Sequence, residues 1–135
     1  MKIHFKNIPE VFENTAKKYP KNIFFQIKKS NDYVKYTYEQ TYLMVQSLAF
    51  NLSKLIKPNE KIAILSENRP EWCIAYLGIS SIGCTAVPLD TNLTEENLIL
   101  FLNHSDAVAI ITSGNFVDKI SGIRNKVIKL KRIIS

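Results

Sequence analysis

The chain has 135 residues, a formal net charge of +6 at pH 7 and 46% hydrophobic residues, a composition that suits one folded domain with its own core. No apolar run reaches the roughly 18 residues needed to cross a bilayer, and the N-terminus lacks the apolar segment of a secretory signal. Cys73 and Cys84 are isolated, which is typical of small core residues in a reducing compartment. We therefore expect a cytoplasmic protein.

The first 60 residues predict a helix, a hairpin and a long helix. Residues 9–19 form the short helix, which Pro20 ends, and its apolar stripe is Val11, Phe12, Thr15, Ala16 and Tyr19. Residues 23–27 and 33–37 are the strands of an antiparallel hairpin, joined by the turn formers Ser30, Asn31 and Asp32. Side-chain alternation should place on one face of the first strand Ile23, Phe25 and Ile27.

A capping box predicts where the long helix begins. Thr37 can accept a hydrogen bond from the first turn, and Gln40 can reach back to the cap. The helix should run to about residue 56, with a wide apolar stripe of Tyr38, Tyr42, Val45, Leu48, Ala49, Leu52, Leu55 and Ile56. Lys57 and Pro58 break it, and Asn59 tolerates a left-handed turn conformation.

Residues 61–135 alternate between strand and helix. Residues 62–65 read as a buried strand, and Pro70 suits the first turn of a helix that stays apolar on nearly every side up to residue 82. Gly83 is the expected stop of this helix. Residues 85–87 form the next strand, which should run parallel to the first.

The alternation continues to the end of the chain. Thr94 should cap a helix whose inward residues are Leu98, Phe101, Leu102 and Ser105. Residues 107–111 and 130–134 read as strands, and between them a helix is marked by Phe116, Ile120, Ile123 and Val127. The pattern βαβαβαβ predicts an α/β fold, a doubly wound and mostly parallel layer preceded by a helix and a hairpin. Since a strand reaches the last residue, we expect a fragment of a longer protein.

Ligands in such sheets bind beyond the carboxyl ends of the strands, which points to residues 66–69 and 88–91. Arg69 could pair with a phosphate or carboxylate, and Asn68 could hydrogen-bond to one. We favour the interpretation that both side chains fix the loop where the helix begins, with Trp72 packed beneath it.

Other chemistry-bearing residues lack partners in the sequence. His4 and His104 have no neighbour at metal-ligand spacing, and three serines have no visible base, namely Ser66, Ser80 and Ser81. No dinucleotide or Walker A fingerprint occurs. We therefore predict no catalytic, cofactor-binding or metal-binding residue in the chain.

The stretch SENRPEWCIAYLGISSIGCTAVPLD, with KPNEKIAIL before it and residues 94–105 after it, resembles the N-terminal part of an acyl-CoA synthetase. That family belongs to the AMP-binding, adenylate-forming superfamily, and the Asn-Arg-Pro-Glu-Trp loop is most similar to long-chain fatty-acyl members. The resemblance runs from Pro9 to Ile134 but covers only the opening segment of such an enzyme. Asn59-Glu60 stands where the family commonly carries Gly-Asp. Thr112-Ser113-Gly114 begins like the family's phosphate loop, but Asn115 follows, so that match is incidental.

The resemblance implies the N-terminal scaffold segment of an ATP-dependent long-chain fatty acid–CoA ligase. The full-length enzyme would use ATP, Mg²⁺ and CoA to form an acyl-adenylate and then a thioester. None of these cofactors is expected to bind this segment alone, since the family's phosphate loop, acidic residues and lysine are absent from the sequence. The implied partners are the remainder of its own polypeptide and the fatty acid substrate. Residues 1–60 and 61–135 would both belong to the AMP-binding domain.

Two alternatives remain at this point. The chain could be a stand-alone α/β module that binds a partner or a small anion, whereas a fragment should expose apolar surface and self-associate. In addition, residues 113–135 carry six basic residues and one acidic residue. Without any nucleic-acid motif we expect no nucleic acid, and we prefer a solvated helix face, with peripheral membrane contact as the alternative.

Overall fold

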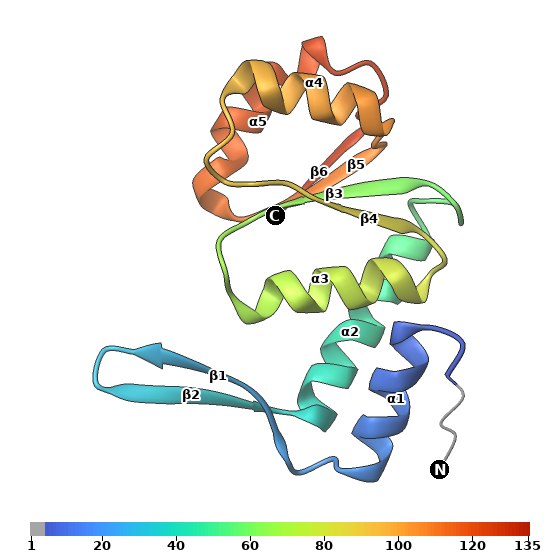
Figure 1. The fold of residues 1–135 in the computed structure, drawn as a ribbon, viewed down its shortest axis with the longest axis vertical. Helices are drawn as coiled ribbons and strands as arrows, with labels where there is room; N and C mark the ends of the chain where they lie inside the picture. Colours follow the sequence, from blue (N-terminus) through green and yellow to red (C-terminus); the bar gives the residue numbers. More distant parts are fainter. Residues whose placement is uncertain (1–4) are drawn as a thin grey trace. The chain divides into compact units, whose positions relative to one another are not determined.

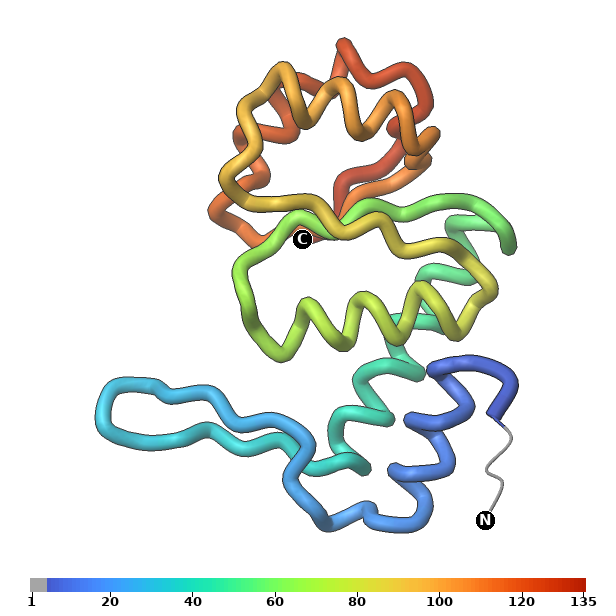
Figure 2. Tube along the Cα trace, in the orientation of Figure 1, coloured from blue at the N-terminus to red at the C-terminus, as the bar shows by residue number. Residues whose placement is uncertain are grey.

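The structure is a computed structural model that describes residues 5–135, and it divides into two compact units. The first unit holds the chain up to Leu55 together with residues 69–82, and the second holds residues 56–68 and 83–135. Figure 1 labels the elements of each unit, and Figure 2 follows the path of the chain through them.

The first unit contains three helices whose starts are set by local sequence. Helix α1, Ile8–Lys18, begins after Asn7, whose side chain accepts from the backbone of Glu10 at 2.9 Å. Helix α2, Tyr38–Ser53, begins with the predicted capping box, in which both reciprocal hydrogen bonds are present. Helix α3, Pro70–Ser81, carries proline at its first position, as predicted.

A small apolar core joins these helices. It consists of Phe12, Val45, Ile74 and Leu77, with Phe24, Tyr38, Tyr42 and Leu48 packed against it. Gly78 of α3 lies very close to α2, since a β-carbon built at this glycine would stand 3.0 Å from Leu48 Cδ2. The absence of a side chain at Gly78 therefore sets how closely α2 and α3 approach.

The hairpin of the first unit is antiparallel, as predicted. Strands β1, Ile23–Lys29, and β2, Asp32–Thr37, are joined by a tight turn in which Ser30 has a left-handed φ of 53°. The pairing register shifts between Ile23 and Phe25. The predicted alternation of Ile23, Phe25 and Ile27 on one face is interrupted at this shift, and Ile23 is exposed whereas Phe25 and Ile27 are half-buried.

The second unit is built on a parallel four-stranded sheet with the order β4-β3-β5-β6. Its strands are β3, Lys61–Leu65; β4, Thr85–Pro88; β5, Ala109–Thr112; and β6, Arg132–Ile134. The predicted mixed α/β fold with a parallel sheet is thereby confirmed, and β3 and β4 run in the same direction as expected.

Helices α4, Glu95–Ser105, and α5, Val117–Ile123, lie together beside this sheet in Figure 1. The predicted cap of α4 is present, since Thr94 accepts from the backbone of Asn97 at 3.3 Å. The core between helices and sheet consists of Ala63, Leu65, Leu98, Leu102, Ala107, Ile110, Ile120, Ile123, Val127 and Leu130. These residues bury one face of the sheet, and most of them lie in the strands and helix faces that the sequence predicted to be buried.

Two left-handed residues close the turns that precede β3 and β4. Asn59 has a φ of 68° and Gly83 a φ of 72°, which confirms both expected turn positions. The Asn59 amide donates to the Gly83 carbonyl at 2.8 Å, and Thr85 donates to the Glu60 carbonyl at 3.0 Å. These bonds fix the starts of the two strands beside each other.

Several predicted details are wrong at the ends or faces of helices. Helix α2 stops at Ser53 rather than near residue 56, and the last predicted helix ends at Ile123 and continues only as a short 3-10 turn, η2, Arg124–Lys126. Four apolar residues assigned to helix stripes are exposed instead, namely Val11, Tyr19, Leu55 and Phe101. The sequence pattern overestimates the number of buried residues, because each helix packs only a narrow face against the core and leaves some of its apolar residues in solvent. Among the described residues, no helix has both the length and the apolar character needed to span a bilayer.

Candidate functional site

The carboxyl edge of the parallel sheet brings two polar loops together. Leu65 at the end of β3 pairs with Thr112 at the end of β5, so the residues that follow each strand leave the sheet side by side. The Thr112 hydroxyl donates to the Leu65 carbonyl at 2.9 Å, and the Ser113 amide donates to the same carbonyl at 3.3 Å. This is the edge at which the strand order predicts a ligand.

Glu67 is the charged group of this edge. Its Oε1 accepts from Asn115 Nδ2 at 2.6 Å, which ties the loop after β3 to the loop after β5. The Ser113 and Asn115 side chains hold the pKa of Glu67 at about 2, below the ordinary value of 4.5. The Ser113 hydroxyl is buried close to this carboxylate, although it makes no hydrogen bond of ordinary geometry. The carboxylate therefore stays ionised at pH 7 and is a poor proton carrier there.

Thr112, Ser113 and Gly114 do not fit a phosphate-binding loop. The Thr112 and Ser113 side chains are buried, and Gly114 begins a 3-10 turn, η1, Gly114–Phe116, rather than a glycine-rich loop. A phosphate site of that kind needs backbone donors that converge on open space. Within residues 5–135 no group of three acidic, histidine or cysteine side chains could hold a metal ion either.

The loop after β4 is folded onto itself. Asp90 Oδ1 accepts from the Asn92 amide at 2.8 Å and from the Asn92 side chain at 3.0 Å. Leu89 donates to the Ile64 carbonyl at 2.9 Å, which keeps the loop on the end of β3. The Asp90 carboxylate thus stabilises its own turn.

Arg69, the predicted anion-binding candidate, lies in the first unit as the residue before α3. Its Nε donates to Glu71 Oε2 at 2.8 Å, and this contact is the main reason that the pKa of Glu71 is lowered. Trp72 stacks on Tyr76 with ring centroids 5.8 Å apart. These contacts stabilise the first turns of α3.

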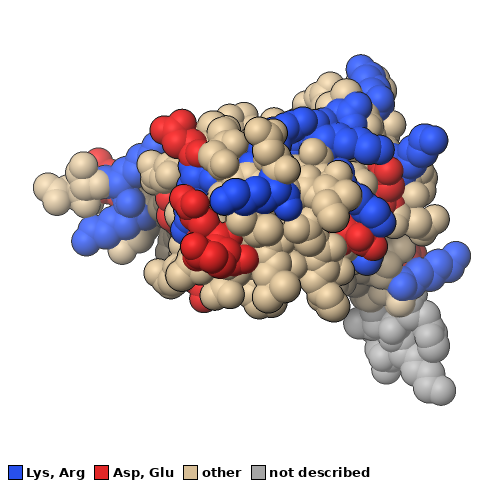
Figure 3. Space-filling model, turned by 90° about the horizontal axis from the view of Figure 1, so that it is seen from above, with Lys and Arg blue, Asp and Glu red and all other residues tan. Residues whose placement is uncertain are grey.

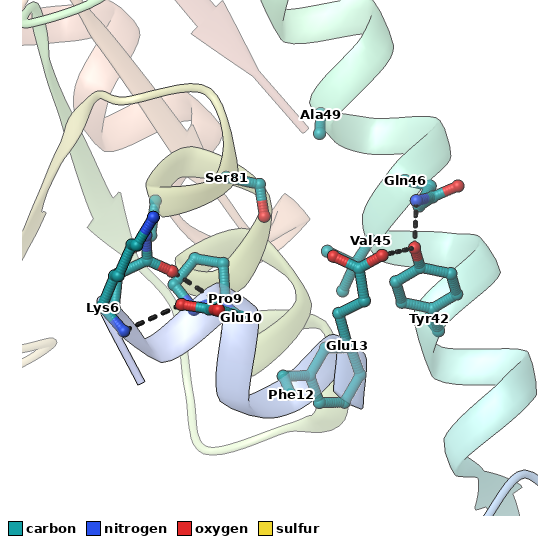
Figure 4. A pocket seen from close by; sticks show the side chains of 12 residues that line it. Lys6, Pro9, Glu10, Phe12, Glu13, Tyr42, Val45, Gln46, Ala49 and Ser81 are labelled. Carbon is teal, nitrogen blue, oxygen red and sulfur yellow. Dashed lines mark hydrogen bonds between the residues drawn. The ribbon is translucent and has the colours of Figure 1, made fainter. Parts of the chain in front are cut away.

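A pocket that the sequence did not reveal lies in the first unit (Figure 4). It has a volume of about 600 Å³ and is lined by α1, α2 and the end of α3. Tyr42 Oη donates to Glu13 Oε1 at 3.0 Å, and Gln46 donates to the same hydroxyl from the next turn of α2. Its apolar wall includes Phe12 and Val45.

The polar groups of this pocket hold α1 on α2. Hydrogen bonds from Lys17, at 2.6 Å, and from Tyr42 lower the pKa of Glu13. Burial, and then the contact with Glu13, raises the pKa of Tyr42. At pH 7 the carboxylate is ionised and the phenol protonated, so the pair forms a stable bond between helices rather than an acid–base pair.

The remaining chemistry-bearing residues take structural positions. Cys73 is half-buried and Cys84 is buried, and burial raises the pKa of both thiols, which keeps them protonated. His104 is exposed in the last turn of α4. His4 lies outside the described residues.

Comparison with known proteins identifies the family of the chain. Residues 12–135 match the family described as AMP-binding enzyme. The chain belongs to the AMP-binding enzyme family. The chain spans about a fifth or less of the length of the single-enzyme relatives that it matches.

Two curated relatives illustrate the range of similar enzymes. A 4-coumarate–CoA ligase of Vanilla planifolia is 37% identical over 86 residues, which cover 63% of this chain and 16% of the ligase. A chloroplastic long-chain-fatty-acid–[acyl-carrier-protein] ligase of Arabidopsis thaliana is 28% identical over 108 residues, which cover 79% of this chain and 15% of that protein. AMP-binding enzymes with different acyl substrates are therefore similar to the chain.

Among solved structures, a Mycobacterium tuberculosis fatty acyl CoA synthetase matches with a TM-score of 0.84 and 26% identity. The match covers 96% of this chain and 26% of that structure. The resemblance to acyl-CoA synthetases is thus confirmed, and the chain corresponds to the N-terminal part of an adenylate-forming enzyme.

Sequence reasoning found the edge of the sheet but not its central contact. The predicted loops were residues 66–69 and 88–91, whereas Glu67 bonds to Asn115 in the loop after β5. The signal was present, since loops that follow neighbouring parallel strands emerge at one edge. No sequence pattern predicted the pocket, because Glu13 and Tyr42 come into contact only when α1 packs on α2.

Proposed function

We propose that this chain is the N-terminal scaffold of an ATP-dependent long-chain fatty acid–CoA ligase. The carrying observation is the family match over residues 12–135, together with the likeness over 96% of the chain to a fatty acyl CoA synthetase. The Asn68-Arg69-Pro70 loop and the similar long-chain-fatty-acid ligase of Arabidopsis thaliana favour a fatty acid over other carboxylates. The complete protein would form an acyl-adenylate and then pass the acyl group to CoA.

The part that this chain plays is to position other residues. Its loops at the carboxyl edge of the sheet are tied by Glu67 and Asn115, and Thr112 and Ser113 turn into the fold rather than toward a phosphate. We infer that ATP, Mg²⁺ and CoA are bound by other segments of the complete protein. The unpaired Cys73 and Cys84 support a cytoplasmic location.

A hydroxycinnamic acid is the second candidate substrate. The 37% identity to the 4-coumarate–CoA ligase of Vanilla planifolia exceeds the identity to the fatty-acid ligase, although it extends over fewer residues. Both candidates share the same reaction type, so only the acyl group distinguishes them.

The test measures thioester formation by the complete protein that contains this sequence. Purified protein is given ATP, Mg²⁺ and CoA with hexadecanoate, octanoate or 4-coumarate, and acyl-CoA and AMP are quantified. We expect the highest kcat/KM with hexadecanoate. A preference for 4-coumarate would replace the fatty acid by the second candidate. A protein that binds a carboxylate or phosphate without forming AMP would instead favour a stand-alone binding module.

A further inference from the structure

One loop of the second unit presents a large apolar side chain to solvent. Ile128, between η2 and β6, is 89% exposed, the highest value among the exposed large hydrophobic residues of the described chain. Its neighbours Val127 and Leu130 are buried at 4% and 6%. The loop is thus anchored in the core on both sides of Ile128, and the isoleucine points away from it.

Hydrogen bonds hold this loop in shape. The Asn103 side chain of α4 donates to the Lys126 carbonyl at 3.0 Å and accepts from the Ile128 amide at 2.9 Å. The Arg124 guanidinium donates to the Lys131 carbonyl at 2.9 Å, which closes the loop across its base. Because its backbone is fixed, the loop cannot readily fold Ile128 back into the protein.

Basic side chains surround this apolar tip. Residues 124–132 contain no acidic residue and five basic ones, Arg124, Lys126, Lys129, Lys131 and Arg132. Three carboxylates lie near them: Asp106 pairs with Lys129 at 3.0 Å, Glu96 interacts weakly with Lys126, and Glu60 lines the same pocket as Lys129 and Lys131. The balance of these groups remains positive, and Figure 3 shows both Lys and Arg side chains and Asp and Glu side chains at the protein surface.

Helix α4 adds apolar surface to the same unit. Leu100 is 60% exposed and lies one turn before Asn103, the residue that holds the loop, and Phe101 next to it is 43% exposed. Exposed apolar side chains next to a cluster of lysines are typical of proteins that bind at the surface of a membrane.

We propose that the loop of residues 124–131 binds the surface of an anionic lipid bilayer, with Ile128 entering the headgroup region and the basic residues contacting lipid phosphates. This contact is separate from the proposed ligase activity. A solvated helix face explains the lysines but not the exposed isoleucine, and if the remainder of the polypeptide covered Ile128, Ile128→Gln would leave vesicle binding unchanged. Nucleic acid would also match the charge, but its phosphate backbone offers nothing that an isoleucine would recognise. Each lysine near an anionic leaflet adds roughly a fivefold gain in binding, so the cluster and the apolar tip reinforce each other.

The experiment measures sedimentation of the complete protein with vesicles of phosphatidylcholine alone or of phosphatidylcholine with phosphatidylglycerol. We expect binding only to the anionic vesicles and loss of binding at high salt. Ile128→Gln should weaken binding about tenfold, the value for partial burial of one isoleucine. The double variant Lys126→Gln with Lys131→Gln should weaken it roughly 30-fold.

Matched controls keep the proposal falsifiable. Leu43 is 61% exposed on α2 in the other unit, so Leu43→Gln should leave vesicle binding unchanged. Lys21→Gln with Lys35→Gln removes the same charge from that unit and should have a much smaller effect. The proposal would be overturned if both lysine double variants lost vesicle binding equally. It would also be overturned if Ile128→Gln and Leu43→Gln bound vesicles equally well.

Two further results would also overturn it. Binding to duplex DNA at the same salt, unaffected by Ile128→Gln, would assign the basic residues to nucleic acid. A concentration-dependent dimer that Ile128→Gln abolishes, without vesicle binding, would assign the tip to an interface between copies of the chain.

Discussion

Replacing Gly83 by alanine should destabilise the protein through backbone conformation alone. Gly83 has a φ of 72°, a region that residues with a β-carbon avoid. A β-carbon there would meet only Pro58, at 3.8 Å, which is ordinary van der Waals contact. The loss therefore comes from the left-handed conformation, which costs a non-glycine residue about 1–2 kcal/mol.

Gly122 of α5 provides the matched control. A β-carbon at Gly122 would meet nothing within 4 Å, and its φ is not positive. Gly122→Ala should thus stabilise the protein by up to about 1 kcal/mol, the difference in helix propensity. Gly83→Asn should lose less than Gly83→Ala, because asparagine adopts the left-handed conformation more readily.

Urea unfolding followed by circular dichroism measures all three variants. The slope of the free energy of unfolding against urea should be unchanged, so that shifts in midpoint report stability directly. If Gly83→Ala and Gly122→Ala shift the midpoint in the same direction, the backbone argument is refuted. A change in slope would mean that the substitution alters the unfolded state instead.

Three further predictions follow from burial, charge and the role of the chain. Leu102→Ala should lower the free energy of unfolding by about 2–5 kcal/mol, whereas Leu100→Ala on the exposed side of α4 should change it by less than about 0.5 kcal/mol; urea midpoints of the two variants test this. The pKa of Glu67 is lowered to about 2, so its contribution to stability is present above pH 4.5 and is lost as the pH falls toward 2. Glu67→Gln should therefore flatten the dependence of the free energy of unfolding on pH between these values. An unaltered pH profile would contradict the assignment. The purified 135-residue chain should form no acyl-adenylate from hexadecanoate and ATP, as measured by exchange of labelled pyrophosphate, and detectable exchange would contradict the scaffold role.

The features predicted best from the sequence are those whose cause is local. The Thr37–Gln40 capping box, the proline at the start of α3 and the left-handed turns at Asn59 and Gly83 each depend on a few adjacent residues. Such signals do not require knowledge of the partner surface. The parallel order of β3 and β4 follows similarly from the length of the connection between them.

The features that the sequence did not predict depend on contacts between distant residues. Ile23 is exposed next to a register shift of the hairpin, and Phe101 is exposed on α4, whose buried residues are Leu98 and Leu102. In the site, Glu67 and Asn115 meet across neighbouring strands although they are far apart in the chain. Residue type alone does not identify such a pair.

The hydrogen bond from Asn59 to Gly83 joins the turns that precede β3 and β4, and it therefore helps to set the register between these two strands. This bond and the one from Thr85 to Glu60 align the two strands at their first residues, so the strand pairing is fixed where each strand begins. Evolutionary insertions and deletions should therefore be rejected at the turns of Asn59 and Gly83, which precede the two strands.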